Sequence, residues 1–69
     1  MAEIYFNNCS LSVKETYEEV VNHLYYAEQK KYEFIELNEF YPYFDATKTK
    51  MVTGTRKVCV SVKHLIYII

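Results

Sequence analysis

Glycine and proline are nearly absent from this 69-residue chain, which has one of each and no tryptophan. A single glycine, Gly54, cannot form the glycine-rich loop that cradles phosphate groups. The scarcity of both residues, together with a hydrophobic content of 51%, argues against a disordered polypeptide. We therefore expect residues 1–69 to form one small folded domain.

Long apolar runs are also absent. The longest, residues 65–69, is far shorter than the about 20 residues that a membrane-spanning helix needs. Residues 1–6 have neither the basic start nor the apolar stretch of a signal peptide. We therefore expect a cytoplasmic protein that makes no membrane contact. In that compartment Cys9 and Cys59 are expected to be reduced and mostly buried.

The apolar pattern predicts an α+β domain in the order β-α-β-β(-β). Apolar residues from Val13 to Ala27 recur at spacings of three and four, which predicts one amphipathic helix. Ser12 and Glu15 form a Ser-x-x-Glu capping box, so the helix is expected to begin there. Strands are predicted at residues 3–7, 32–40 and 56–69, with residues 48–52 as a further strand or as part of a loop over 43–55.

This order predicts one amphipathic helix packed on one face of a three- to four-stranded, mainly antiparallel sheet. Pro42 is expected either to end the second strand or to place it at a sheet edge, because it lacks a backbone donor. The last strand is expected to bend near Lys63 and His64. Residues 65–69 are apolar at every position, which predicts a strand in the interior, between two layers or between two copies of the molecule.

A single helix covers only one face of the sheet, so the other face is expected to be apolar and exposed. Exposed apolar patches of this kind mark association surfaces, and we therefore predict a homodimer or another protein as partner. The candidate interaction surface consists of Phe34, Phe40, Tyr41, Tyr43, Phe44, Leu65, Tyr67 and Ile69.

The chain has eight tyrosines and four phenylalanines, more rings than a small core can bury. Four of these predicted contact residues lie in the segment 40–44, on either side of Pro42. This segment either contacts a protein partner, stacks on unpaired bases, or folds back over the open sheet face.

Charge is distributed unevenly along the chain. Residues 1–45 hold three lysines and all nine acids, a net charge of −6, whereas residues 46–69 hold five basic residues and no acid, a net charge of +5. The two halves either neutralise each other across the sheet or face different partners. The candidate basic patch consists of Lys48, Lys50, Arg56, Lys57 and Lys63.

Two alternative functions follow from this distribution. The basic patch with nearby rings could bind single-stranded nucleic acid, although the isoelectric point of about 6.1 and the lack of a nucleic-acid-binding motif argue against it. The acidic residues could instead imitate a row of phosphates and inhibit a nucleic-acid-binding protein. This acidic set consists of Glu15, Glu18, Glu19, Glu33, Glu36 and Glu39.

The chain offers no convincing catalytic or metal site. His23, His64, Cys9 and Cys59 lack the spacing of a zinc site, and no nucleophile is paired with a base. We predict no cofactor, no metal, no small-molecule ligand and no enzymatic activity. The sequence therefore favours a non-enzymatic protein-interaction module, with the high Tyr, Ile, Asn and Lys content suggesting a bacterial or phage accessory protein.

Overall fold

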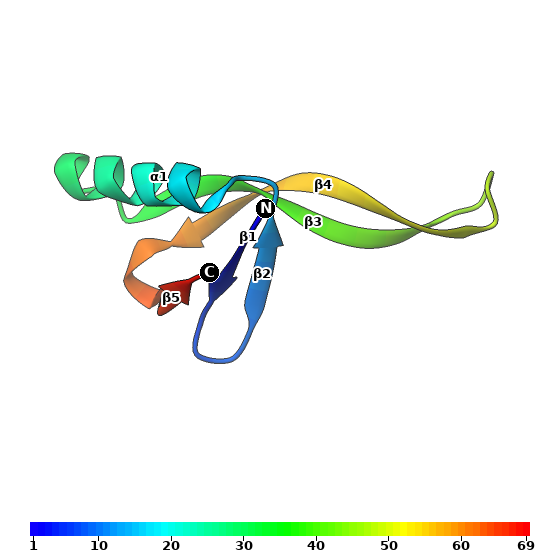
Figure 1. Ribbon diagram of the computed structural model, residues 1–69, viewed down its shortest axis with the longest axis horizontal. Coiled ribbons are helices and arrows are strands. Elements are labelled where there is room, and N and C mark those ends of the chain that lie inside the picture. Colours follow the sequence, from blue (N-terminus) through cyan, green and yellow to red (C-terminus); the bar gives the residue numbers. More distant parts are fainter.

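A computed structural model describes all 69 residues of the chain. Its elements, shown in Figure 1, run in the order β1 (Ala2–Tyr5), β2 (Ser10–Val13), α1 (Tyr17–Lys30), β3 (Phe34–Asp45), β4 (Lys50–Ser61), the 3-10 helix η1 (Val62–His64) and β5 (Tyr67–Ile68).

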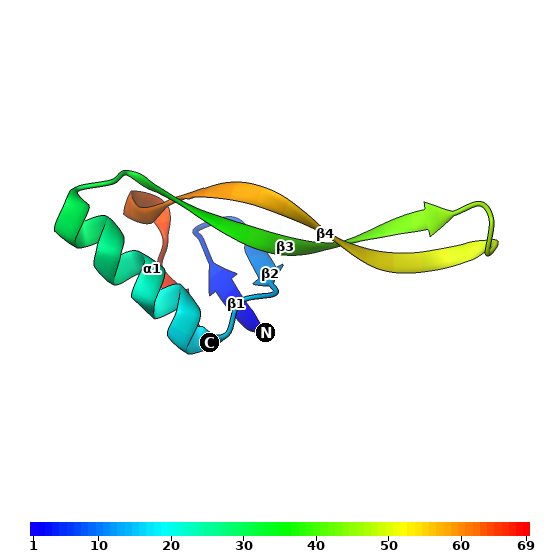
Figure 2. The ribbon, with the colours of Figure 1, turned by 90° about the horizontal axis from the view of Figure 1, so that it is seen from above.

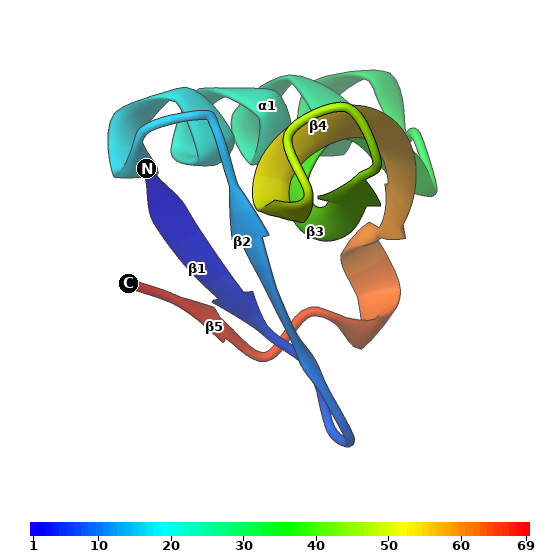
Figure 3. The same cartoon turned by 90° about the vertical axis from the view of Figure 1, so that its right-hand side faces the viewer.

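The five strands form one sheet in the order β4-β3-β2-β1-β5, and every neighbouring pair is antiparallel. Figure 3 shows α1 lying across one side of the strands. We call the side that α1 covers the helix face and the other side the open face. The predicted α+β fold with one helix on one face of the sheet is confirmed, but the sheet has five strands where three or four were predicted.

The additional strand is β2, which occupies residues that were predicted to begin the helix. Ser12 does not cap the helix but pairs with Glu3 in β1. The capping box lies one turn later, where Thr16 Oγ1 accepts from the Glu19 N–H at 3.2 Å and Glu19 Oε1 accepts from the Thr16 N–H at 3.0 Å. The chain has two consecutive boxes of this kind, and tertiary packing selects the second because Val13 is buried when β2 pairs with β1.

The hydrophobic core lies between α1 and the helix face of the sheet. Helix α1 supplies Val20 and Ala27 to it, whereas Tyr17 and Val21 of the predicted apolar stripe are exposed. Leu24 is half-buried against the core. The eight buried residues are Ala2, Ile4, Val13, Val20, Ala27, Ile35, Leu37 and Val60.

Strands β3 and β4 are much longer than the rest of the sheet. They pair without a bulge from Phe34↔Ser61 to Asp45↔Lys50, whereas β2 reaches β3 only at Val13↔Glu39. Beyond that point the hairpin projects away from α1 as a twisted two-stranded ribbon (Figures 1 and 2). We call residues 40–55 the arm. It gives the molecule an elongated shape of 45 × 21 × 18 Å.

The structure decides between the alternatives predicted for this region. Pro42 does not end the strand; it pairs with Thr53 where β3 is a sheet edge, which was the other predicted outcome. Residues 50–55 form part of β4 and not of a loop. At Pro42 the arm has no strand beside β3 other than β4, so the missing proline N–H leaves no ladder bond unmade. A turn over residues 46–49 closes the hairpin, with Thr49 in the left-handed region at φ 53°.

The end of the chain also differs from the prediction. The expected bend near Lys63 and His64 is present as η1, but residues 65–69 do not lie inside the structure. They return along β1 as an edge strand, with Glu3 and Ile69 exchanging backbone hydrogen bonds of 2.8 and 2.9 Å. The apolar run is therefore at the sheet edge because η1 reverses the chain before it can continue β4.

Candidate functional site

The helix face of the arm carries a chain of polar and aromatic contacts. Arg56 Nε donates to Glu39 Oε1 at 2.9 Å, and the Arg56 guanidinium carbon lies 4.7 Å from the centre of the Tyr41 ring. The Tyr41 and Tyr43 ring centres are 5.7 Å apart. This cation–π and ring–ring row keeps both tyrosines against the hairpin surface.

Gly54 makes room for these rings. It lies opposite Tyr41 in the register, and a Cβ atom at position 54 would lie 2.9 Å from Tyr43 Cε1 and 3.3 Å from Tyr41 Cε1. Any larger residue would therefore push the rings away from β4. Close approach of side chains over the backbone is a common reason for glycine inside a strand.

The open face of the arm is more apolar. Phe44 and Met51 are directly opposite each other near the tip and are 59% and 60% exposed. Phe40 and Pro42 follow on the same face, because side chains alternate along a strand. No other part of the chain therefore covers Phe44 and Met51.

The turn at the arm tip is ordered by Asp45. Its Oδ1 atom accepts from the Thr47 hydroxyl at 2.6 Å and from the Thr47 N–H at 2.9 Å. Both hydrogen bonds lower the pKa of the Asp45 carboxyl, and the bond from the Thr47 hydroxyl has the larger effect. The carboxylate therefore organises the turn while ionised.

The root of the arm is fixed to the body of the protein at Asn38. The Glu15 carboxylate accepts from the Asn38 N–H at 3.0 Å and from its side-chain amide at 2.7 Å, while the Asn38 carbonyl accepts from the Lys14 N–H at 2.8 Å. Burial alone would raise the pKa of Glu15, but these hydrogen bonds outweigh it and lower that pKa. The segment before α1 thus sets the direction of the arm.

The structure divides the predicted interaction residues among three places. Phe40, Tyr41, Tyr43 and Phe44 lie on the two faces of the arm, and Leu65 packs against the core. The remaining three lie on the open face or at its edge, namely Phe34, Tyr67 and Ile69, and all three are exposed. The arm is therefore the only part that brings several of them together.

Tyr67 has a partner that the sequence did not indicate. Its ring stacks on Tyr5 with 4.5 Å between centroids and an interplanar angle of 9°. The Tyr5 hydroxyl donates to Glu3 at 2.6 Å, and this bond raises the pKa of Tyr5. The pair covers the open face at the β1–β5 edge, so part of that face is covered by aromatic and polar residues of the chain itself.

The basic residues do not form one surface. Arg56 and Lys57 are neighbours in β4, so they project from opposite faces of the sheet. Each is paired with a glutamate of β3, Arg56 with Glu39 and Lys57 with Glu36 at 3.4 Å. Lys48 and Lys50 lie at the arm tip and Lys63 in η1, and these three form no ion pair.

The acidic residues are also divided. Glu36 and Glu39 are on opposite faces of β3 and are each ion-paired, while Glu15 is occupied by Asn38. Glu18 and Glu19 lie in the first turn of α1, where negative charge favours the helix N-terminus. The six glutamates therefore do not form a single row.

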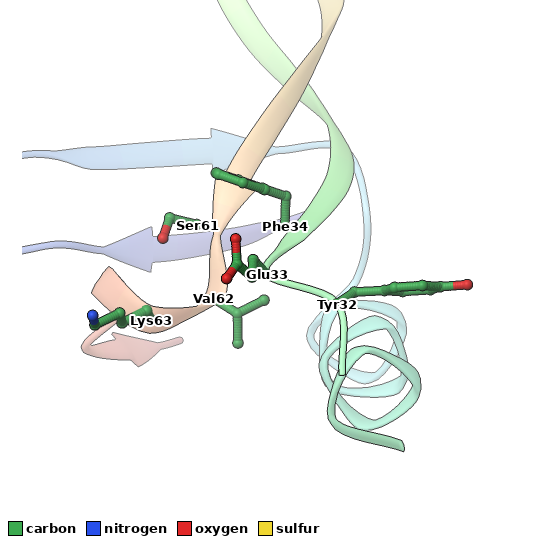
Figure 4. A pocket seen from close by; sticks show the side chains of 6 residues that line it. All are labelled: Tyr32, Glu33, Phe34, Ser61, Val62 and Lys63. Atoms are coloured by element: carbon green, nitrogen blue, oxygen red, sulfur yellow. The ribbon is translucent and has the colours of Figure 1, made fainter. Parts of the chain in front are cut away.

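A shallow depression of about 390 Å³ lies at the end of the hairpin opposite the arm. Figure 4 shows its lining side chains, with the Tyr32 ring extending away from Val62 and Lys63. Phe34 and Ser61 flank it from β3 and β4, and Glu33 is its one acidic residue. This mixture of exposed rings and single charges does not indicate a particular ligand class.

Cys9 and Cys59 are both free thiols and both exposed, so the expectation that they are buried is wrong. Cys9 lies in the β1–β2 turn, and Cys59 projects from the open face of β4. The His64 ring lies 3.0 Å from the Ser61 hydroxyl. No three His, Cys, Asp or Glu side chains are arranged to hold a metal ion.

Comparison with protein-family models, curated proteins and solved structures gives no match, so no relative supplies a function for the arm. The structure contains no helix with the length and apolarity needed to cross a membrane.

Proposed function

We propose that this chain is a protein-interaction module that binds its partner through the arm. The observation that carries the proposal is the exposed Phe44–Met51 pair at the arm tip, beyond the reach of the core. Aromatic residues, methionine and arginine are enriched at protein interfaces. The arm contains aromatic residues and Met51, and Arg56 directly follows it. A protein partner would bury the apolar pair and the exposed Tyr43 ring.

The stability of the arm supports the same proposal. An isolated two-stranded hairpin is only marginally stable in water. Here the root is held by the Glu15–Asn38 and Arg56–Glu39 contacts, but residues beyond Tyr43 have only the opposite strand to pack against. A projecting ribbon with apolar residues is well suited to bind a partner that supplies the missing packing.

The single-stranded nucleic-acid alternative has weaker support. Binding of a phosphate backbone relies on several free cations on one surface. Of the five candidate basic residues, Arg56 and Lys57 are paired with glutamates and face opposite ways. Only Lys48 and Lys50 remain at the arm tip, beside the ionised Asp45.

A pull-down with paired variants tests the proposal. The tagged chain is incubated with lysate of the source cells, and retained proteins, the untagged chain included, are quantified by mass spectrometry. Phe44→Ser with Met51→Ser removes the arm pair, and Tyr25→Ser with Tyr26→Ser is the control because these helix residues are similarly exposed, at 58% and 63%. We expect the control to retain the same proteins as the wild type and the arm variant to lose them; equal retention by both variants contradicts the proposal.

A further inference from the structure

We infer that the protein partner of the arm is a second copy of this chain, and that the two copies pair in antiparallel fashion along the free edges of β4. This inference rests on the proposed function and specifies the partner. It follows from which backbone groups are free, from the charges along β4, and from what the pairing would cover.

Strand β4 is the outermost strand of the sheet over all of its 12 residues. The Val62 N–H donates to the Glu33 carbonyl at 3.0 Å, and hydrogen-bonded pairs alternate along an antiparallel ladder. Even-numbered residues of β4 therefore bond to β3. The odd-numbered residues direct their backbone N–H and C=O groups to the free edge, namely Met51, Thr53, Thr55, Lys57, Cys59 and Ser61.

The two edges of the arm differ in their protection. On the β3 side, Pro42 interrupts the row of donors, which is one way in which proteins prevent edge-to-edge pairing. The β4 edge has no proline and no bulge. Of its three charged residues, Lys50 lies at the start of the strand, and Arg56 and Lys57 are held by Glu39 and Glu36 within the same copy. The β4 edge is thus a long, regular and unblocked template for another strand.

The charges on β4 select a register. A two-fold axis at Arg56 or Lys57 would place that cation opposite its own copy, and an axis at Thr53 would place Lys50 opposite Arg56; like charges directly opposite each other destabilise a sheet. An axis at Thr55 or at Gly54 avoids all of these contacts, but an axis at Gly54 would place Val52 opposite Arg56 and Met51 opposite Lys57. The axis at Thr55 instead pairs Val52 with Val58, Met51 with Cys59, and Arg56 with Gly54.

This register covers the exposed apolar residues of the arm. On the helix face, Val52 and Tyr43 of each arm would continue the row formed by Leu37 and the half-buried Val58 of the other copy. On the open face, Met51 and Phe44 would lie beside Cys59. The pairing would thereby extend a core of only eight residues, and small domains with so few buried residues are commonly stabilised by association.

Net charge favours the antiparallel arrangement over a parallel one. The arm carries Lys48, Lys50 and Asp45, which give it a net charge of +1. Because the whole chain has a net charge of −1, the residues outside the arm have a net charge of −2. Antiparallel pairing places each arm beside the body of the other copy. Parallel pairing would place the two positive arms together.

Sedimentation equilibrium of the full chain at about 100 µM tests the pairing. We expect the wild type to have twice the chain mass of 8.3 kDa. Thr55→Pro removes a donor that faces the free edge, and Thr55→Lys places two cations opposite each other at the axis; we expect both to have the mass of one chain with an unchanged far-ultraviolet circular dichroism spectrum. If the proline disrupts the hairpin itself, the Thr55→Lys variant still tests the pairing. A monomeric wild type, or a dimeric Thr55→Lys variant, overturns the inference.

A cross-linking experiment tests the register. In a Cys9→Ser, Cys59→Ser background, Thr55→Cys should form a disulfide-linked dimer on mild oxidation, because directly opposite residues have Cα atoms about 5.5 Å apart. Thr53→Cys is the matched control, since Thr53 faces Lys57 in this register. Cross-linking of the control to the same extent overturns the register.

The two proposals fail in different ways. If the wild type is monomeric but Phe44→Ser with Met51→Ser still abolishes retention of another protein, the partner is not a second copy while the arm remains the binding element. If both variant pairs of the pull-down behave alike, the arm is not the binding element.

Discussion

The Glu15 carboxylate binds Asn38 through both the backbone N–H and the side-chain amide of that residue. Asn38 lies where β3 leaves the five-stranded sheet and enters the two-stranded hairpin, and its carbonyl is bound by the Lys14 N–H. The residues just before α1 therefore clamp the root of the arm. Without this clamp, the hairpin would be free to bend at the point where β2 ends.

Loss of the clamp should destabilise the protein. Glu15→Ala removes three hydrogen bonds to a partly buried residue, and we expect the free energy of unfolding to fall by about 1–2 kcal/mol. Glu18→Ala, in the first turn of α1, is the control and should cost about 0.5 kcal/mol through the helix dipole. Urea unfolding measures both values; equal losses would contradict the role of Glu15.

Stability should also fall on acidification. The folded-state pKa of Glu15 is lowered, so the unfolded chain binds more protons in this range and stability increases with pH. The contribution of Glu15 is complete above the unfolded carboxyl pKa of about 4.3 and is lost as the pH falls through the lower folded value. Glu15→Gln should therefore flatten the dependence of unfolding free energy on pH below about pH 4.3. A slope unchanged from the wild type would show that other carboxylates dominate.

The body and the arm should respond differently to truncation of apolar residues. Leu37 is fully buried beneath α1, and Leu37→Ala should cost about 2–5 kcal/mol. Phe44→Ala removes a larger side chain that is exposed in the single chain, and its cost in a monomeric background such as Thr55→Lys should be within about 0.5 kcal/mol. Thermal unfolding of the two variants in that background makes the comparison. A large cost for Phe44→Ala would mean that the arm packs on its own body.

Gly54→Ala tests the ring row on the helix face of the arm. The new methyl group would approach Tyr43 Cε1 to 2.9 Å, so the rings of Tyr43 and Tyr41 must shift. We expect changed ring-proton chemical shifts for both tyrosines and a weaker contact between Arg56 and Tyr41. Thr53→Ala on the opposite face is the control and should leave those shifts unchanged. Unchanged shifts in Gly54→Ala would contradict the tight packing over Gly54.

Local pattern was sufficient to predict the helix and the face on which it packs. The spacing of Val20, Leu24 and Ala27 and the acids of the first turn identify α1 in isolation. The strand β2 was missed because Ser12-x-x-Glu15 and Thr16-x-x-Glu19 are equally good capping boxes. Only the long-range pairing of β2 with β1 distinguishes them.

The candidate site was predicted in part. The segment 40–44 could be predicted as a candidate contact surface because the chain has more rings than the core can bury, and the structure places this segment in the arm. Met51 and Gly54 were missed, because their relation to Phe44 and Tyr41 depends on the register set by the turn at 46–49. Pro42 indicated either a strand end or a sheet edge, and the register decides for the edge because it directs the proline nitrogen away from β4.

Site-resolved amide hydrogen exchange at increasing protein concentration tests the central claim, that the arm is a binding element whose β4 edge pairs with a second copy. We expect the edge-facing amides of Met51, Thr53, Thr55 and Lys57 to become protected as the protein concentration rises. The Phe44 amide, on the opposite edge of the same arm, should continue to exchange rapidly. If the edge-facing amides and the Phe44 amide exchange at the same rate at every concentration, the β4 edge is free and the inferred pairing is contradicted.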